Sequence, residues 1–370
     1  MNPTRQLHEF GQSLWLDDIS RELMDDGRLR RYIDEFSLTG LTSNPSIFDA
    51  AIGGGHAYDD GIREKHAAGL SGERLFMALA LEDLRRAADL FRPAFDASDG
   101  VDGWVSMEVS PLLAGDTGGS IEAAQRIHRQ GERPNLFVKI PGTPAGVPAI
   151  EELTFVGVPV NVTLLFSGEQ YVASAEAYLR GIERRIAAGL DPSVASVASL
   201  FVSRWDKAVS APEKGRALPA ELRNRLGIAI AQRTYRAYRE LLASPRWRAL
   251  AAAGARVQRL LWASTGTKDP GASDTLYIEA LVAPDTINTM PEKTLHAFAD
   301  HGRVGPPMAE DGGDCEDTLA RFARGGVDID ALAQRLQQEG AEAFVKSWKE
   351  LMNRIAEKTA ALGGVREARR

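Results

Sequence analysis

A lysine inside an apolar run of this 370-residue sequence could act as a nucleophile. Residues 135–148 read NLFVKIPGTPAGVP, and Pro141-Gly142 ends the run just after Lys139. In a strand, alternation places the side chains of Phe137 and Lys139 on one face. An apolar pocket lowers the pKa of a lysine, which leaves a neutral amine able to attack a carbonyl. The alternative is a structural lysine whose stem lies on apolar surface while its ammonium reaches water.

Eight short apolar runs, nearly all separated by helical patterns, must position this lysine. They cover about residues 14–17, 38–42, 104–109, 135–140, 159–165, 196–202, 259–264 and 277–282. Eight alternating β and α units predict a parallel sheet, and eight is the number that closes a (β/α)8 TIM barrel. An open doubly wound sheet is the competing architecture, but no glycine fingerprint follows the first run. The sequence therefore predicts an α/β fold, a (β/α)8 barrel with extra helices.

The barrel is expected to be a single domain over residues 1–370, enlarged at two places. Residues 205–255, with a loop at 211–219, would form an enlarged helical connection between the sixth and seventh strands. Residues 303–370 would add C-terminal helices packed on the barrel, at about 316–325 and 329–362. A helical pattern over 19–36 predicts one more long helix near the N-terminus.

Composition and charge narrow the class of protein. A net charge of −7 argues against nucleic acid and against an anionic membrane as the main partner. The single Cys315 excludes an internal disulfide and fits a reducing compartment. Residues 1–20 lack a signal-peptide core, and the longest apolar run, 155–166, is too short to span a bilayer. We therefore expect a cytoplasmic, water-soluble protein with small-molecule partners, as a monomer or homodimer.

Polar residues end seven of the eight runs or follow them directly. In a (β/α)8 enzyme the chemistry lies at the carboxyl ends of the strands, so these residues should converge. The candidate site residues are Asp17, Asn44, Glu108, Lys139, Asn161, Thr163, Ser199, Phe201, Arg204, Ser264 and Lys268.

Each candidate also has a structural explanation when taken alone. Asp17 could be a helix N-cap, and Asn44 could serve the Asn-Pro turn. Glu108 could form a purely structural pair with Lys139. Arg204 could pair with a surface carboxylate, and the remaining residues are common in strands and loops. The convergence of the whole set is what favours a catalytic pocket.

A buried lysine flanked by carboxylates has a chemical logic. The amine attacks a ketone, and Glu108 can move the protons of dehydration, directly or through a water held with Thr163. The protonated imine is an electron sink, so a carbon–carbon bond two atoms away can break if Asp17 accepts the neighbouring hydroxyl proton. The other candidates can bind the polyol hydroxyls (Asn44, Asn161 and Ser199) and a phosphate (Arg204, Ser264 and Lys268).

Other chemistries lack their motifs. The six histidines show no HExxH or Cys/His spacing, so no metal site is predicted. No GxSxG elbow and no GxxxxGK[ST] loop occur. Cys315 lies in an acidic glycine-rich loop, which does not suit a nucleophile.

At this point seven segments resemble the transaldolase family. They are GLTSNPSIF (40–48), VSMEVSP (105–111), NLFVKIPGT (135–143), VNVTLLFS (160–167), ASLFVSRWD (198–206), WASTGTKDP (262–270) and EALVAPDTINTMP (279–291). The sequence is most similar to the longer branch found in actinobacteria and related bacteria. The resemblance implies a class I, Schiff-base aldolase barrel of the pentose phosphate pathway. Such enzymes transfer a dihydroxyacetone unit between sugar phosphates without metal or organic cofactor.

The resemblance also implies roles for individual residues. Lys139 resembles the Schiff-base lysine, Asp17 the base for the C4 hydroxyl, and Glu108 with Thr163 the pair that manages the catalytic water. The hydroxyl ligands would be Asn44, Asn161 and Ser199, and the phosphate ligands Arg204 and Ser264. Where the shorter form has Ser-Phe-Arg, this chain has Ser264-Thr265-Gly266, so Lys268 is expected to replace the second phosphate arginine.

The implied reaction converts sedoheptulose 7-phosphate and glyceraldehyde 3-phosphate reversibly to erythrose 4-phosphate and fructose 6-phosphate. Two alternatives remain open. The first is a fructose 6-phosphate aldolase-like lyase, whose relatives tend to carry Gln and Tyr where this chain has Glu108 and Phe201. The second is a catalytically inactive barrel that binds sugar phosphates.

Overall fold

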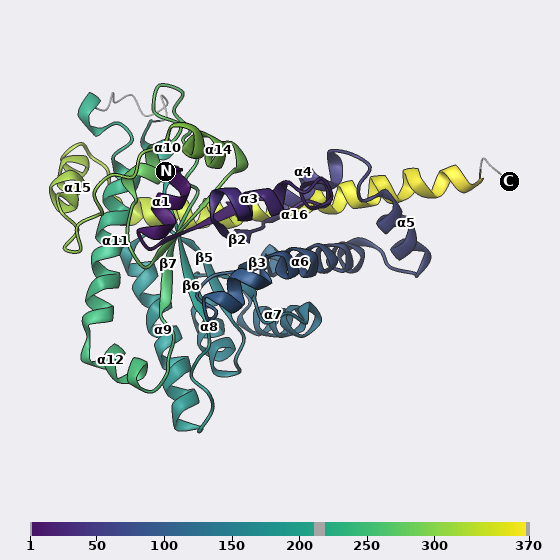
Figure 1. The fold of residues 1–370 in the computed structure, drawn as a ribbon, viewed down its shortest axis with the longest axis horizontal. Helices are drawn as coiled ribbons and strands as arrows, with labels where there is room; N and C mark the ends of the chain where they lie inside the picture. Colours follow the sequence, from purple (N-terminus) through teal and green to yellow (C-terminus); the bar gives the residue numbers. More distant parts are fainter. Residues whose placement is uncertain (1, 211–218, 368–370) are drawn as a thin grey trace.

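The computed structural model describes residues 2–210 and 219–367, and its eight strands form one closed, all-parallel barrel (Figure 1). The strands follow one another around the barrel in sequence order, and β8 closes on β1. Their bounds are β1 Gln12–Asp17, β2 Leu38–Thr42, β3 Trp104–Glu108, β4 Leu136–Pro141, β5 Val160–Leu165, β6 Ser196–Phe201, β7 Gln258–Ala263 and β8 Thr286–Met290. The predicted (β/α)8 barrel is confirmed.

Helices connect the strands and cover the outside of the barrel, as parallel strands require. The first eight helices are α1 Pro3–Glu9, α2 Arg21–Asp25, α3 Arg28–Phe36, α4 Pro45–Gly53, α5 Asp59–Ala67, α6 Gly72–Ala97, α7 Thr117–Gly131 and α8 Gly146–Phe155. The others are α9 Gly168–Ala187, α10 Ser203–Ser210, α11 Leu226–Ala243, α12 Pro245–Ala252, α13 Leu276–Ala280, α14 Glu292–His301, α15 Cys315–Arg324 and α16 Ile329–Glu367. Two short 3₁₀ turns, η1 Pro111–Leu113 and η3 Ala220–Leu222, complete the described elements.

Side chains fill the interior of the barrel in the half nearer the amino ends of the strands. Trp15 and Phe137 both point inward, with ring centroids 6.2 Å apart, and Trp104 stacks on Phe137. Gly40 makes room for this packing, because a Cβ there would lie 2.6 Å from the Trp15 ring. The same inward alternation then carries Asp17, Glu108 and Lys139 to the upper rim.

The prediction of the eighth strand was wrong. Residues 277–282 lie largely in the short helix α13, where Tyr277 and Ile278 are buried, and the strand itself is β8 at Thr286–Met290. β8 contains three polar residues, so it lacks the apolar run that marks a buried strand. All three side chains are buried inside the fold. Thr286 Oγ1, for example, accepts a hydrogen bond from Gln12 Nε2 at 2.8 Å.

The predicted helix over 19–36 is also corrected, because it consists of α2 and α3. Gly27 between them has φ +78°, a left-handed conformation that breaks the helix and favours glycine. Between β6 and β7 the chain forms α10, η3, α11 and α12. The loop expected at 211–219 lies almost wholly outside the described residues.

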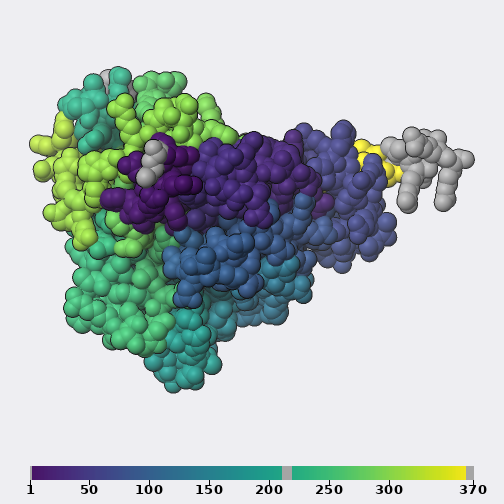
Figure 2. Space-filling model, in the orientation of Figure 1, coloured from purple at the N-terminus to yellow at the C-terminus, as the bar shows by residue number. Residues whose placement is uncertain are grey.

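The C-terminal helix α16 runs from the barrel toward α5, and its end emerges beyond that helix (Figures 1 and 2). It packs against α4, α5, α6, η1 and β5. Its buried side chains recur every three or four residues, as expected of an amphipathic helix. They include Leu332, Leu336, Trp348, Leu351 and Ile355.

Within residues 2–210 and 219–367, no helix is both long and apolar enough to cross a membrane.

Candidate active site

The register of the barrel brings the candidate catalytic residues to one level. Glu108 at the end of β3 pairs with Lys139 on β4, and Lys139 pairs with Asn161 on β5. Asp17, the last residue of β1, pairs with Thr42 on β2. The carboxyl ends of these strands therefore form one polar rim at the mouth of the barrel.

Lys139 is 5% exposed, and its amine faces two acceptors. Nζ donates a hydrogen bond to the backbone oxygen of Ser43 at 2.9 Å and lies 3.8 Å from Oε1 of Glu108. The amine is therefore enclosed, which contradicts the snorkelling alternative in which it reaches water. It is also held next to a carboxylate that can exchange protons with it.

Glu108 is a buried carboxylate with free oxygens. Neither oxygen accepts a hydrogen bond from any residue that the structure describes, and the same holds for the buried Oγ1 of Thr163. Burial raises the pKa of Glu108 to about 7; the charge of Lys139 opposes this rise and the charge of Asp17 adds to it. A carboxyl with a pKa near neutrality can both donate and accept a proton, which suits general acid–base chemistry.

Asp17 is held by a chain of hydroxyl groups. Thr42 Oγ1 donates to Asp17 Oδ1 at 2.7 Å, and the Thr289 hydroxyl lies 2.8 Å from that of Thr42. Burial raises the pKa of Asp17, whereas the charge of Lys139 and the Thr42 hydrogen bond lower it. The N-cap of α2 is Ser20, which accepts from Leu23 N, so Asp17 does not cap this helix.

A cavity of about 580 Å³ opens beside Asp17. It is lined by the loops after β1, β2 and β8, including Asp18, Ser46 and Glu292. Burial, together with the charges of Glu292 and Asp17, raises the pKa of Asp18 to about 6. Asp17 lines this cavity, whereas Lys139 and Glu108 do not.

A row of hydrogen bonds joins β6, β5 and β3 at this rim. Ser199 Oγ donates to Asn161 Oδ1 at 2.7 Å, and Asn161 Nδ2 donates to Ser106 Oγ at 3.1 Å. All three residues are buried. The row fixes the Asn161 amide and leaves its second N–H able to face a ligand.

Asn44 lies at the Asn-Pro turn after β2 and caps the helix that follows, as its structural alternative predicted. Its Oδ1 accepts from Ile47 N at 3.1 Å and from Ser46 Oγ at 2.6 Å, so it is the N-cap of α4. Capping uses the oxygen only, and the amide nitrogen stays available at the end of β2.

The candidate phosphate residues gather after β6 and β7. Arg204 in the first turn of α10 stacks over Phe201, with its guanidinium carbon 5.1 Å from the ring centroid. Ser264 has φ +56°, and its hydroxyl lies 2.9 Å from that of Ser203. Lys268 is exposed, yet its positive charge reaches Asp17 and helps to lower the pKa of that carboxyl. All three cations of the site, Lys139 included, therefore face the same rim.

Sequence reasoning missed four supporting residues. Thr42, Ser106 and Ser203 lie within the quoted motifs, and their signal was the alternation that places them on the inward face or next to a candidate. Thr289 was missed because the eighth strand was misplaced.

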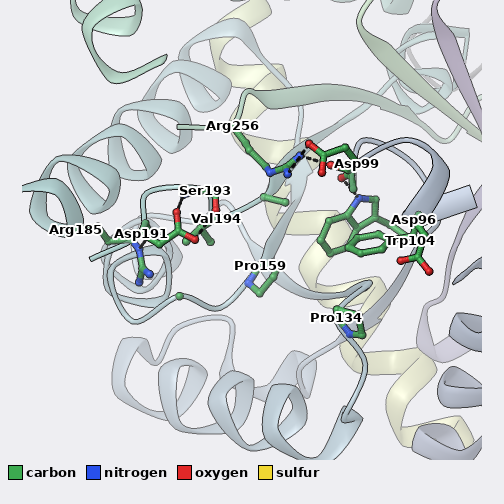
Figure 3. Close-up of a pocket in the computed structure, with 14 residues that line it drawn as sticks. Asp96, Asp99, Trp104, Pro134, Pro159, Arg185, Asp191, Ser193, Val194 and Arg256 are labelled. Atoms are coloured by element: carbon green, nitrogen blue, oxygen red, sulfur yellow. Dashed lines mark hydrogen bonds and ion pairs between the residues drawn. The ribbon is translucent and has the colours of Figure 1, made fainter. Parts of the chain in front are cut away.

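A second pocket lies at the opposite end of the barrel (Figure 3). Its volume is about 390 Å³, and it is lined by residues that precede the strands, including Asp99, Asp191 and Arg256. Its charged groups already have partners within the protein, because Arg256 forms an ion pair with Asp99 and the Asp191 carboxylate accepts hydrogen bonds from Ser193. The groups that could do chemistry are at the other end.

Comparison with known proteins agrees with this arrangement. The family model described as "Transaldolase/Fructose-6-phosphate aldolase" matches residues 14–355, from β1 into α16. This chain belongs to that family. The transaldolase of Thiobacillus denitrificans is 47% identical over 358 residues, covering 96% of this chain and 100% of the relative.

Actinobacterial relatives show the same full-length similarity, as the resemblance to the longer branch predicted. The transaldolase of Parafrankia sp. is 45% identical over 96% of this chain and 97% of its own length. That of Thermobifida fusca is 45% identical over 97% of this chain and 99% of its own length.

Proposed function

We propose that this protein is a transaldolase, a transferase that moves a dihydroxyacetone unit from sedoheptulose 7-phosphate to glyceraldehyde 3-phosphate. The products are erythrose 4-phosphate and fructose 6-phosphate, and the reaction is reversible. The near-full-length similarity to transaldolases supports the activity. The observation that carries the mechanism is the enclosed amine of Lys139, 3.8 Å from a carboxylate that titrates near neutrality.

Lys139 is the proposed nucleophile. Glu108 accepts a proton from its ammonium, and the free amine attacks the C2 carbonyl of the ketose to form a carbinolamine. The C2 hydroxyl then leaves as water, with its proton supplied by Glu108 directly or through a water shared with Thr163. The result is an iminium ion in which Nζ is double-bonded to C2.

Asp17 is the proposed base for bond cleavage. It takes the proton of the C4 hydroxyl, the C3–C4 bond breaks, and its electron pair enters the iminium to give an enamine. The shortened aldose phosphate leaves, and the enamine carbon attacks the aldehyde of the acceptor. Asp17 returns its proton to the new hydroxyl, and hydrolysis of the imine frees Lys139. The iminium is the electron sink, so the proposed cycle uses neither metal nor organic cofactor.

The remaining residues are proposed to hold the substrate. The Nδ2 groups of Asn44 and Asn161 and the Ser199 hydroxyl would bind sugar hydroxyls, while Phe201 lines the pocket. Arg204, Ser264 and Lys268 would bind the phosphate.

Two alternatives compete with transfer. An aldolase-like lyase would release free dihydroxyacetone, whereas Glu108 and Phe201 support a transferase. An inactive sugar-phosphate-binding barrel would not need the set of Lys139, Glu108 and Asp17 at one rim. We further propose that the chain forms one domain, acts in the cytoplasm as a monomer or homodimer, and takes sugar phosphates as its partners.

A product assay tests this function. The enzyme is incubated with fructose 6-phosphate, with and without erythrose 4-phosphate, and sedoheptulose 7-phosphate and dihydroxyacetone are both measured. A transaldolase forms sedoheptulose 7-phosphate only with the acceptor and releases little dihydroxyacetone. Steady release of dihydroxyacetone without acceptor would establish the lyase, and no product in either case would establish the inactive barrel.

A further inference from the structure

Arg204 is a largely enclosed cation. The negative charges of Glu108 and of Glu339 on α16 act on it, but neither carboxylate comes close enough to form an ion pair. It forms no ion pair or hydrogen bond with any residue in the described part of the chain. Many other arginines of the protein use their donors internally; Arg246, for example, contacts both Glu176 and Glu183. An arginine kept without such partners retains five N–H donors for an anion.

Aromatic rings hold this guanidinium from two elements that are far apart in the sequence. Its carbon lies 5.1 Å from the ring centroid of Phe201 on β6 and 5.9 Å from that of Phe344 on α16. A ring attracts the cation through its π face and uses none of its N–H groups. The two contacts therefore restrain Arg204 without occupying the donors that a ligand needs.

A glycine of α16 allows this close approach. A Cβ on Gly340 would lie 3.2 Å from Nη1 of Arg204 and 3.0 Å from Cδ2 of Leu164. Glycine within a helix is less favourable than alanine, so its presence here has to be explained by packing. The explanation is the contact between α16 and the rim of the barrel.

One turn earlier, Gln337 fixes the helix to the strands that carry the catalytic residues. Its Nε2 donates to the backbone oxygens of Gly142 and Leu164, both at 3.0 Å. The Gly142 carbonyl comes just after β4, the strand of Lys139. The Leu164 carbonyl lies within β5, next to Thr163. Leu164 has φ +59°, so the hydrogen bond also holds a left-handed residue in place.

We propose that α16 forms part of the phosphate subsite and that Phe344 is a positioning residue, which together with Phe201 restrains Arg204 and leaves its N–H groups free for phosphate. The proposal rests on the sugar-phosphate function given above and names a specificity-determining element for it. Its consequence is that preference for phosphorylated sugars depends on the C-terminal helix as well as on the barrel.

The test is the variant Phe344→Leu, which keeps an apolar side chain and removes the π face. Isothermal titration with inorganic phosphate should show a dissociation constant raised about fivefold. The KM for fructose 6-phosphate should rise by a similar factor, with kcat within about twofold. Borohydride trapping of dihydroxyacetone, which carries no phosphate, should be unchanged.

Trp348→Leu is the matched control, because Trp348 anchors the same helix on Phe76 without touching Arg204. It should lower the melting temperature and leave phosphate binding near the wild-type value. In an Arg204→Lys background, Phe344→Leu should weaken phosphate binding by less than about twofold, because the planar guanidinium is gone.

Three results would overturn the proposal: wild-type protein that binds no phosphate, unchanged binding in Phe344→Leu, or an equal loss in Trp348→Leu. Failure of the proposed function gives a different result. The wild-type enzyme would then turn over no fructose 6-phosphate, whereas calorimetry would still report how Phe344 affects phosphate binding.

Discussion

The two ends of the barrel treat buried charge in opposite ways. At the amino end, Asp102 accepts hydrogen bonds from Ser13 at 2.6 Å and Thr39 at 3.2 Å and pairs with Arg259 at 3.4 Å. Arg259 in turn donates to Ser13 and to the backbone oxygen of Thr286. This network closes the bottom of the barrel and satisfies its own charges.

At the carboxyl end the polar groups are left open. Both oxygens of Glu108 and the hydroxyl of Thr163 lack a hydrogen-bond partner among the described residues, and Arg204 forms no ion pair there. Unpaired buried groups cost stability, and in a binding site a ligand can supply the missing partners. The difference predicts that substitutions at the carboxyl end impair catalysis without lowering stability, whereas those at the amino end lower stability and spare catalysis.

The largest expected effect follows from Lys139→Met. Methionine keeps the shape of the stem but removes the nucleophile, so kcat for transfer should fall by at least about 10⁴-fold. The charge of Lys139 lowers the pKa of Glu108. Once that charge is removed, the carboxyl can stay protonated and neutral. Circular dichroism and the melting temperature should therefore show a folded protein; an unfolded variant would contradict the separation of the two ends.

Glu108→Gln should reduce kcat by about 10²- to 10³-fold, since proton transfer to and from the carbinolamine is lost. The Glu108 carboxyl should also make the stability of the wild-type protein depend on pH. The pKa of Glu108 rises from 4.5 to about 7 on folding, so the wild type binds an extra proton in this window and loses stability as pH increases.

Relative to wild type, the Gln variant should therefore gain on the order of 2–3 kcal/mol between pH 4.5 and pH 7, at about 1.36 kcal/mol per pKa unit. Urea unfolding of both proteins across this range measures the difference. A difference that is constant with pH would show that Glu108 has an ordinary pKa.

Thr42→Val should have a smaller effect that appears mainly in the pH profile. Its hydroxyl lowers the pKa of Asp17 by donating at 2.7 Å. Without this hydroxyl the pKa of Asp17 rises further. Because the ionised carboxylate is the base, the variant should lose activity at a higher pH than the wild type when the pH is lowered. We expect the acidic limb of kcat to move up by less than about one pH unit. Thr42→Ser, which keeps the hydroxyl, should retain the wild-type limb.

The smallest effect on activity is expected from Asp102→Ala at the amino end. Removing one partner leaves Arg259 buried without a counter-ion, so the free energy of unfolding should fall by about 3 kcal/mol. The kcat should stay within about twofold of wild type. Asp99→Asn is the control, because asparagine tolerates the φ of +51° at this position. Asp99 is 98% exposed where it pairs with Arg256, so loss of its charge should not change stability measurably.

The sequence predicted the barrel and most of the rim because both depend on local pattern. Asp17, Glu108 and Lys139 stand out as single charged residues in short apolar runs, and the closed parallel sheet brings them together. The eighth strand was missed because Thr286 and Thr289 are satisfied by partners on β1 and β2 that lie far away in the sequence.

The contribution of α16 could not be predicted for a similar reason. Its apolar periodicity indicates a helix that packs on something, but not on what. The contacts of Gln337 and Phe344 join segments more than 130 residues apart, as from Phe344 to Arg204. Only the three-dimensional structure shows that this helix reaches the rim.

The central claim is that the enclosed amine of Lys139 bonds covalently to the donor sugar. Borohydride reduction in the presence of fructose 6-phosphate, followed by peptide mass spectrometry, tests it most directly. The account predicts a reduced three-carbon adduct on the peptide that contains Lys139 and no adduct on Lys139→Met. An adduct on another lysine, or equal trapping by Lys139→Met, would contradict it.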